Sequence, residues 1–250
     1  MHEDETGGHI GKKLHWFHVN STPFLTHLQW HQRRGKVAID QIGILPLYQG
    51  RLMRDRLNSY DHYDCEQSIC GAHLLRDLTA VFEQFKQQWA SDMKDLLLLM
   101  NDLAYQYRGQ GALWLPSPLR NDLVARYFEI LLSGLAAQPP PVPRPVGMRG
   151  KQAQTEAKNL LDALLQRAHQ VLAFLDDLPI PFTNNQAERD LRMVKVQQKI
   201  SATFRCEDGA TAFCRIRSYL STLHKQGRPL LDALVAVFVG HPFPIALSLG

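Results

Sequence analysis

One stretch of the sequence, Asn184 to Lys195, combines an acid with several cations at helical spacing. Four charged residues recur at intervals of four, three and four, which places them on one face of a helix: Glu188, Arg192, Lys195 and Lys199. Apolar residues line the adjoining face: Ala187, Leu191 and Val194. On such a helix the carboxylate can hold a metal ion while the Arg and Lys side chains bind phosphate oxygens.

The glutamate of this stretch has a second interpretation. Asn185 and Glu188 have the spacing of a capping box, in which the glutamate only satisfies a backbone N–H at the start of the helix. On spacing alone, the capping box is the preferred interpretation.

A group of thiols and imidazoles offers another chemistry. Its members are separated by two, four and two residues: His62, Cys65, Cys70 and His73. Short spacings of this kind are typical of structural zinc sites. The alternative is that Cys70 and His73 form a structural pair at the start of a helix, and we prefer this alternative to zinc. Cys206 and Cys214 are expected to be packing residues.

Two further acids stand near predicted strands. Asp55 ends the strand predicted for residues 50–55, and Asp4 lies between Glu3 and Glu5 close to the first residue. Alone, Asp55 is an ordinary strand-end aspartate and Asp4 belongs to a terminus that usually frays.

The elements that must position these residues follow from the sequence pattern. Aromatic and β-branched residues predict strands at 13–19 and 25–31, joined as a hairpin through Asn20-Ser-Thr-Pro23, with a short helix at 35–42. From Ser68 the apolar period becomes helical. Helices are predicted within 74–135, at 160–175, from 185, at 210–224 and at 229–240, and the proline-rich stretch 138–150 predicts a linker.

Composition and charge narrow the class of protein. Of the 250 residues, 45% are hydrophobic and 21% are charged, which indicates a folded chain rather than a disordered one. The window from Asn185 to Arg228 holds nine Lys and Arg against four Asp and Glu, a charge of 9 − 4 = +5. This charge indicates a polyanionic partner or, equally, a solvated helix surface. The apolar stretches are too short to cross a bilayer, so a cytoplasmic location is expected.

Long segments of the chain resemble a known family. Asn184-Asn-Gln-Ala-Glu-Arg-Asp-Leu-Arg-Met-Val-Lys195 and the following residues to Gly227 are similar to the C-terminal signature of insertion-sequence-66 family transposases. The resemblance continues through Asp4-Glu-Thr-Gly7, Trp16-Phe-His-Val-Asn-Ser-Thr-Pro23 and Cys70-Gly-Ala-His-Leu-Leu-Arg-Asp-Leu78, and so covers nearly the entire chain.

The resemblance implies an α/β protein with an RNase H-like core, a mixed sheet flanked by helices. It implies a catalytic and metal-binding triad of Asp4, Asp55 and Glu188, which would hold two Mg²⁺ or Mn²⁺ ions. It also implies DNA as the partner of Arg192, Lys195 and Lys199, a homo-oligomer in the active complex, and a bacterial, nucleoid-associated protein. Cleavage and transfer of DNA strands need no protein nucleophile, because the metal ions activate a water molecule or a 3′-hydroxyl group for the attack. The hard oxygen atoms of the three acids suit Mg²⁺ or Mn²⁺ as ligands.

This interpretation divides the chain in two. Residues 1–200 would form the catalytic domain, with a helical insertion at about 74–135, and residues 201–250 a C-terminal helical segment. Relatives carry a coiled coil and a zinc-binding DNA-recognition region ahead of this part, so a truncated copy is expected, with a shortened first strand.

The second acid also departs from the family pattern. Arg54-Asp55-Arg56-Leu57 stands where the family has His-Asp-x-Trp, which adds cations beside the acid. This departure is consistent with a first alternative, a catalytically inactive DNA-binding remnant. The cysteines and histidines leave a second alternative open, a zinc-stabilised helical interaction protein.

Overall fold

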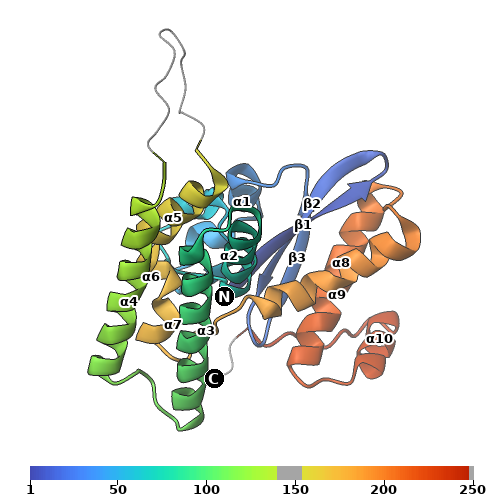
Figure 1. The fold of residues 1–250 in the computed structure, drawn as a ribbon. Helices are drawn as coiled ribbons and strands as arrows, with labels where there is room; N and C mark the ends of the chain where they lie inside the picture. Colours follow the sequence, from blue (N-terminus) through green and yellow to red (C-terminus); the bar gives the residue numbers. More distant parts are fainter. Residues whose placement is uncertain (140–153, 248–250) are drawn as a thin grey trace. The chain divides into compact units, whose positions relative to one another are not determined.

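The computed structural model describes residues 1–139 and 154–247. Within them the protein is a mixed α/β structure with one five-stranded sheet and ten α-helices. The chain divides into two compact units, the first of Met1–Gln67 with Asn184–Gly250 and the second of Ser68–Thr183 (Figure 1). The two units are described separately.

The sheet of the first unit has the strand order β3-β2-β1-β4-β5. Its strands are β1 (His2–Ile10), β2 (Lys13–Ser21), β3 (Thr26–His31), β4 (Arg51–Arg54) and β5 (Glu66–Ile69), and the boundary between the units falls within β5. The β1–β2 and β2–β3 pairs are antiparallel, whereas β1 and β4 are parallel. The predicted hairpin and the strand at 50–55 are therefore confirmed.

The first strand corrects an expectation. A shortened strand was predicted, but β1 has nine residues and pairs with β2 from His2 to Ile10. Its own sequence is poor in β-branched residues, so the aromatic partner strand and the burial it provides decide the conformation. Helix α8 approaches β1 closely at Gly8, where a Cβ atom would lie 2.4 Å from Gln198 Nε2.

Two helices of the first unit pack on the three antiparallel strands β1, β2 and β3. Helix α8 (Asn185–Ser201) lies against β1 and β2, and α9 (Glu207–Lys225) lies along β3 (Figure 1). An apolar cluster joins them, including Phe17, Val19, Leu28, Ala187, Leu191, Val194, Phe204 and Ala210. The predicted apolar face of α8 is thus the buried face. Helix α10 (Leu230–Phe238) follows α9.

Side chains of α9 also bond the free edge of β3. Ser218 Oγ accepts the N–H of Leu28 at 2.8 Å, and Thr222 Oγ1 accepts the N–H of Thr26 at 3.0 Å. One helical turn of four residues rises about 6 Å and two strand residues about 6.6 Å, so the two repeats match. Helix α9 therefore satisfies backbone groups that an edge strand would otherwise expose.

Shorter elements complete the first unit. They are α1 (Lys36–Ile42) and two 3₁₀ turns, η1 (Leu45–Leu47) and η2 (Asn58–His62). Buried residues from these elements, from β4 and from the turn before β5 form a second apolar cluster: Ile39, Leu45, Leu52, Tyr60 and Cys65. The predicted helix at 35–42 is confirmed.

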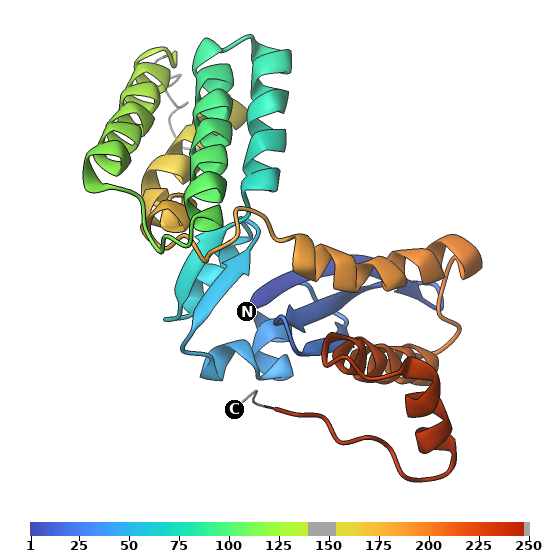
Figure 2. The same cartoon turned by 90° about the horizontal axis from the view of Figure 1, so that it is seen from below.

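The second unit begins with the last two residues of β5, and its other elements are helices. Its helices are α2 (Gly71–Phe85), α3 (Gln88–Gly109), α4 (Ser117–Ala136), α5 (Glu156–Gln166), α6 (Ala168–Val171) and α7 (Ala173–Asp176). In Figure 2 the long helix α3 lies between α2 and α4. The helices predicted within 74–135 are present.

One helix of this unit was predicted wrongly. A single helix was expected at 160–175, but the helix is interrupted at Arg167 and at Leu172, which separates α5, α6 and α7. Each short segment buries its own apolar residues, so packing overrides the continuous helical pattern. Most of the proline-rich stretch 138–150 lies outside the described residues.

Candidate active site

One predicted acid, Asp4, lies on β1, and another, Asp55, directly follows the neighbouring strand β4. His2 of β1 is the partner of Met53 of β4 in a parallel pair. Two residues further along both chains, this register brings Asp4 beside Asp55, which directly follows β4. Adjacent strands lie about 4.8 Å apart, so the two carboxylates come from neighbouring backbone positions.

The face of the sheet that carries Asp4 is defined by its cross-strand partners. Asp4 is paired with Val19 and Thr6 with Phe17. Both of these β2 side chains belong to the apolar cluster that contains Ala187, Leu191 and Val194 of α8. Because directly opposed residues point to the same face, Asp4 lies on the face covered by α8.

The third acid, Glu188, is exposed in the first turn of α8. The residue before this helix, Asn184, is completely buried and holds the helix start on β1. Its Nδ2 donates to the carbonyl oxygen of Glu3 at 2.8 Å, and its Oδ1 lies 2.8 Å from His2 Nδ1. Asn184, rather than the predicted Asn185, is the N-cap residue of α8, and its side chain forms no capping bond to the helix.

The three carboxylates are not assembled into one ligand set. Among the described residues, their oxygen atoms do not all come within 4.8 Å of one another. Asp4 Oδ1 accepts the N–H of Glu5, and Asp55 Oδ1 accepts the N–H of Leu57, each at 2.8 Å. Three like charges repel each other, and a cation between them would remove that cost.

A cation of the protein itself lies beside the second acid. Arg34 Nε donates to Glu5 Oε1 at 2.6 Å, and its Nη2 lies 3.6 Å from Asp55 Oδ2. Its guanidinium also lies over the ring of Trp16, 4.8 Å from the ring centre. Arg34 therefore connects a buried carboxylate to Asp55.

The carboxyl group of Glu5 is buried, which is unusual for an acid. It also accepts a hydrogen bond from the hydroxyl of Tyr60 at 2.7 Å. Burial and the charge of Asp55 raise the pKa of Glu5, while the bonds from Tyr60 and Arg34 lower it. Glu5 and Arg34 were not predicted as site residues. The signal in the sequence for Glu5 was the run of three acids at residues 3–5.

The neighbouring Glu3 is even less accessible. It is 1% exposed, and its Oε2 has no hydrogen-bond partner among the residues that the structure describes. Burial, followed by the charge of Glu5, raises the pKa of Glu3 to about 8. Because strand residues alternate, Glu3 and Glu5 point to the face opposite Asp4.

The arginines around Asp55 have different surroundings. Arg54 is completely buried, donates to Asp61 Oδ1 at 2.6 Å and donates to Gln67 Oε1 at 2.8 Å. Arg54 is thus the internal partner of an acid from η2. Arg54 Nη1 also donates to the main-chain carbonyl oxygen of Asp55 at 3.0 Å, so one of the two predicted cations contacts the backbone of this acid.

The predicted DNA-contacting residues lie on the outer side of α8. Arg192, Lys195 and Lys199 are exposed, as is Glu188. Lys195 Nζ also lies 3.4 Å from the carbonyl oxygen of Gly7 on β1. The cations therefore follow Glu188 along one exposed face of the helix.

The thiols and imidazoles are divided between the two units. Cys65 packs in the apolar cluster with Leu52 and Tyr60, where burial raises its pKa. Cys70 is buried directly before α2, and His73 lies in the first turn of that helix. Cys214 is buried, as expected of a packing residue, but Cys206 is exposed, so that expectation was wrong for Cys206.

No helix of the described residues is both long enough and apolar enough to cross a membrane.

No curated protein and no solved structure gives a significant match to the chain. The family model for the transposase IS66 family matches residues 1–212. That match spans the strands, α8 and all three predicted acids. The chain belongs to the IS66 family of transposases.

Proposed function

We propose that this chain cleaves and transfers DNA strands during movement of an insertion sequence, with Asp4, Asp55 and Glu188 as its metal-binding catalytic residues. Membership of a transposase family supports transposition as the process. The observation that carries the catalytic proposal is the register of the parallel β1–β4 pair, which aligns Asp4 with Asp55.

The sheet supports an RNase H-like core. It is a mixed sheet with three antiparallel strands, a fourth strand parallel to the first and helices packed against it. The parallel pair lies in the middle of the strand order, so two acids 51 residues apart (55 − 4) come from neighbouring strands. Glu188 belongs to α8, the helix that covers the face of the sheet carrying Asp4.

The donor atoms fit a hard divalent cation. All three groups offer carboxylate oxygens, which suit Mg²⁺ or Mn²⁺, and the set contains no thiolate or imidazole. When bound, such ions activate the attacking oxygen and stabilise the leaving oxygen of a phosphoryl displacement. The chain's own part is to hold the three carboxylates in place and to bind phosphate through Arg192, Lys195 and Lys199.

The proposal is tested by titrating the purified full chain with Mn²⁺ and by following the nicking of supercoiled plasmid in Mg²⁺. Asp4→Asn, Asp55→Asn and Glu188→Gln each keep the shape of the side chain and remove its charge. We expect each variant to bind Mn²⁺ at least ~10-fold more weakly. Loss of an outer-shell partner alone costs ~10- to 100-fold in metal affinity, and loss of a direct ligand should cost no less. Asp64→Asn, at an exposed acid of the same unit, is the matched control.

The outcomes separate the proposed function from its alternative. Mn²⁺ affinity and nicking that stay at the wild-type level in all three variants would overturn the triad. The exposed cations of α8 favour a second function, a DNA-binding remnant without catalysis. Affinity for DNA that survives removal of divalent metal, without nicking by the wild-type chain, would favour that remnant.

A further inference from the structure

A buried ion pair links the end of α9 to the middle of α8. Lys225 Nζ lies 2.7 Å from Asp190 Oδ2, and both side chains are largely buried, at 15% and 13% exposed. Asp190 is two residues after Glu188 on α8, whereas Lys225 is the last residue of α9. Lys225 lies beyond the residues 1–212 that match the family model.

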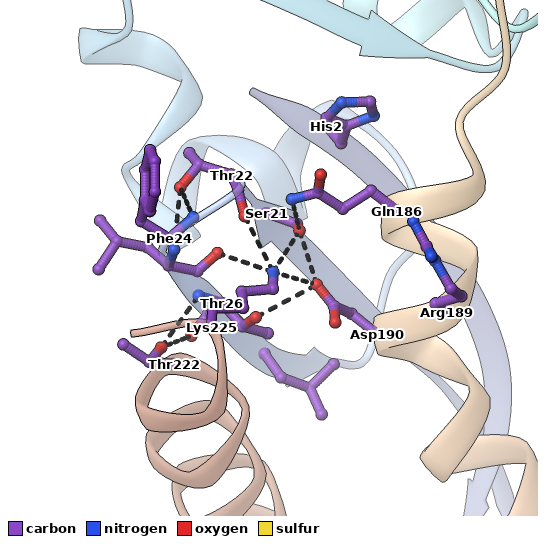
Figure 3. Close-up of polar contacts among 12 residues, drawn as sticks. His2, Ser21, Thr22, Phe24, Thr26, Gln186, Arg189, Asp190, Thr222 and Lys225 are labelled. Atoms are coloured by element: carbon purple, nitrogen blue, oxygen red, sulfur yellow. Dashed lines mark hydrogen bonds and ion pairs between the residues drawn. The ribbon is translucent and has the colours of Figure 1, made fainter. Parts of the chain in front are cut away.

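The ammonium group of Lys225 is surrounded by acceptors. It donates to Ser21 Oγ at 2.9 Å and to the carbonyl oxygens of Thr22 and Leu25 at 3.0 and 3.1 Å. Figure 3 shows these contacts converging on the Lys225 nitrogen, with Asp190 on the opposite side from the turn between β2 and β3. A single side chain therefore binds the turn and α8 together.

The carboxylate of Asp190 has further donors from the sheet. Ser21 Oγ donates to Asp190 Oδ2 at 2.6 Å, and Thr26 Oγ1 donates to the same oxygen at 3.2 Å. Gln186, one turn earlier on α8, donates from Nε2 to Ser21 Oγ at 2.9 Å. The polar face of α8 formed by Gln186 and Asp190 is thus bound to the end of β2.

These contacts fix how α8 is rotated about its own axis. Two residues along a helix differ by about 200° in direction, so Asp190 and Glu188 point to opposite sides. Rotation of the helix that changed the direction of Glu188 would pull Asp190 out of its contacts with Lys225 and Ser21. Asn184 fixes the position of the helix start, and Asp190 fixes its rotation.

We propose that Lys225 and Asp190 are positioning residues that hold Glu188 toward Asp4 and Asp55, so that α9 is part of the catalytic apparatus. This inference rests on the proposed function, because it assigns the ion pair a role in metal binding through Glu188. The two residues touch neither DNA nor metal in this proposal. They act by limiting the rotation of the helix that carries the third acid.

The test is a thermodynamic cycle on Mn²⁺ affinity, measured by calorimetry on the full chain. Lys225→Met removes the charge and keeps the length of the side chain, and Asp190→Asn removes the other charge. We expect each to weaken Mn²⁺ binding by about 10-fold, the lower end of what loss of an outer-shell partner costs. In a Glu188→Gln background, Lys225→Met should cause no further loss.

A control separates positioning from general stability. Ser218→Ala weakens the attachment of α9 to β3 but removes no contact to α8. It should lower the stability of the first unit and leave Mn²⁺ affinity unchanged. Hydrogen exchange of the backbone amides of 186–192 in metal-free protein should become faster in Lys225→Met and stay unchanged in Ser218→Ala. If Lys225→Met does not fold, Ser21→Ala removes one donor to Asp190 and tests the same effect.

The two proposals fail differently. Mn²⁺ affinity that is unchanged in Glu188→Gln would overturn the proposed function and, with it, this inference. A loss in Glu188→Gln with wild-type affinity in both Lys225→Met and Asp190→Asn would overturn the positioning role alone. An equal loss from Lys225→Met in the wild-type and Glu188→Gln backgrounds would also overturn it, because the ion pair would then not act through Glu188.

Discussion

The side-chain amide of Asn184 donates a hydrogen bond of 2.8 Å to the main-chain carbonyl of Glu3. This bond joins residues 181 apart in the chain, and it lies directly beside Asp4 on one element and four residues before Glu188 on the other. A buried carbonyl of a strand thus receives its donor from the start of a helix. The contact determines where α8 begins relative to β1.

Replacing Asn184 by Ala is expected to lower the free energy of unfolding of the first unit by about 1–3 kcal/mol, because the buried Glu3 carbonyl loses its donor. Urea unfolding measures this loss. Asn185→Ala is the matched control, since Asn185 is exposed and stands next in the chain. A similar loss in both variants would show that the buried bond contributes nothing special.

The attachment of α9 to the edge strand gives a second prediction. Ser218→Ala removes the acceptor of the Leu28 N–H, so hydrogen exchange at the Leu28 amide should become faster and stability should fall by about 1 kcal/mol. Ser221→Ala, three residues later on the same helix, is the control. Unchanged protection of Leu28 in Ser218→Ala would mean that the helix does not cap this strand edge.

Local patterns predicted the elements that bury one apolar side. The aromatic runs at 13–19 and 25–31 form β2 and β3, and the predicted stripe of Ala187, Leu191 and Val194 is the buried face of α8. These predictions succeed because the period of a strand or helix is written in neighbouring residues.

Long-range relationships were not predictable in this way. The pairing of His2 with Met53, which aligns Asp4 with Asp55, depends on a register between strands 51 residues apart (53 − 2). The partner of Asp190 is Lys225, 35 residues further on, and nothing in the spacing selects it from the other cations of this basic region. Such pairs are fixed by packing of the whole unit, whereas propensity gives only the elements.

One of the buried histidines of β2, His18, predicts a pH dependence. Burial lowers the pKa of His18 to about 4, so the folded chain holds this imidazole neutral while an unfolded chain, with a pKa near 6.5, takes up a proton. Because the unfolded state binds more protons between these values, stability is present above about pH 6.5 and falls as pH drops toward 4. The loss approaches about 1.4 kcal/mol per pH unit.

His18→Gln should flatten this part of the stability curve, measured by urea unfolding at a series of pH values from 4 to 7. His9→Gln, on the exposed part of β1, controls for the loss of an imidazole. A slope between pH 4 and 6.5 that is the same in His18→Gln as in the wild-type chain would rule out His18 as its source.

The cationic face of α8 gives the last prediction, which concerns DNA. Because Lys and Arg displace counterions from phosphate, affinity for a DNA duplex should fall steeply with salt and should survive removal of divalent metal by a chelator. Lys199→Gln should reduce the slope of log affinity against log salt by about 0.9, the value for one phosphate contact. Fluorescence anisotropy with a labelled duplex measures both quantities. Lys36→Gln removes an exposed cation of α1 that is paired with Asp40, and it should leave the slope unchanged. If salt has no effect on the affinity, or if Lys36→Gln lowers the slope as much as Lys199→Gln does, then the exposed face of α8 is not the surface that binds DNA.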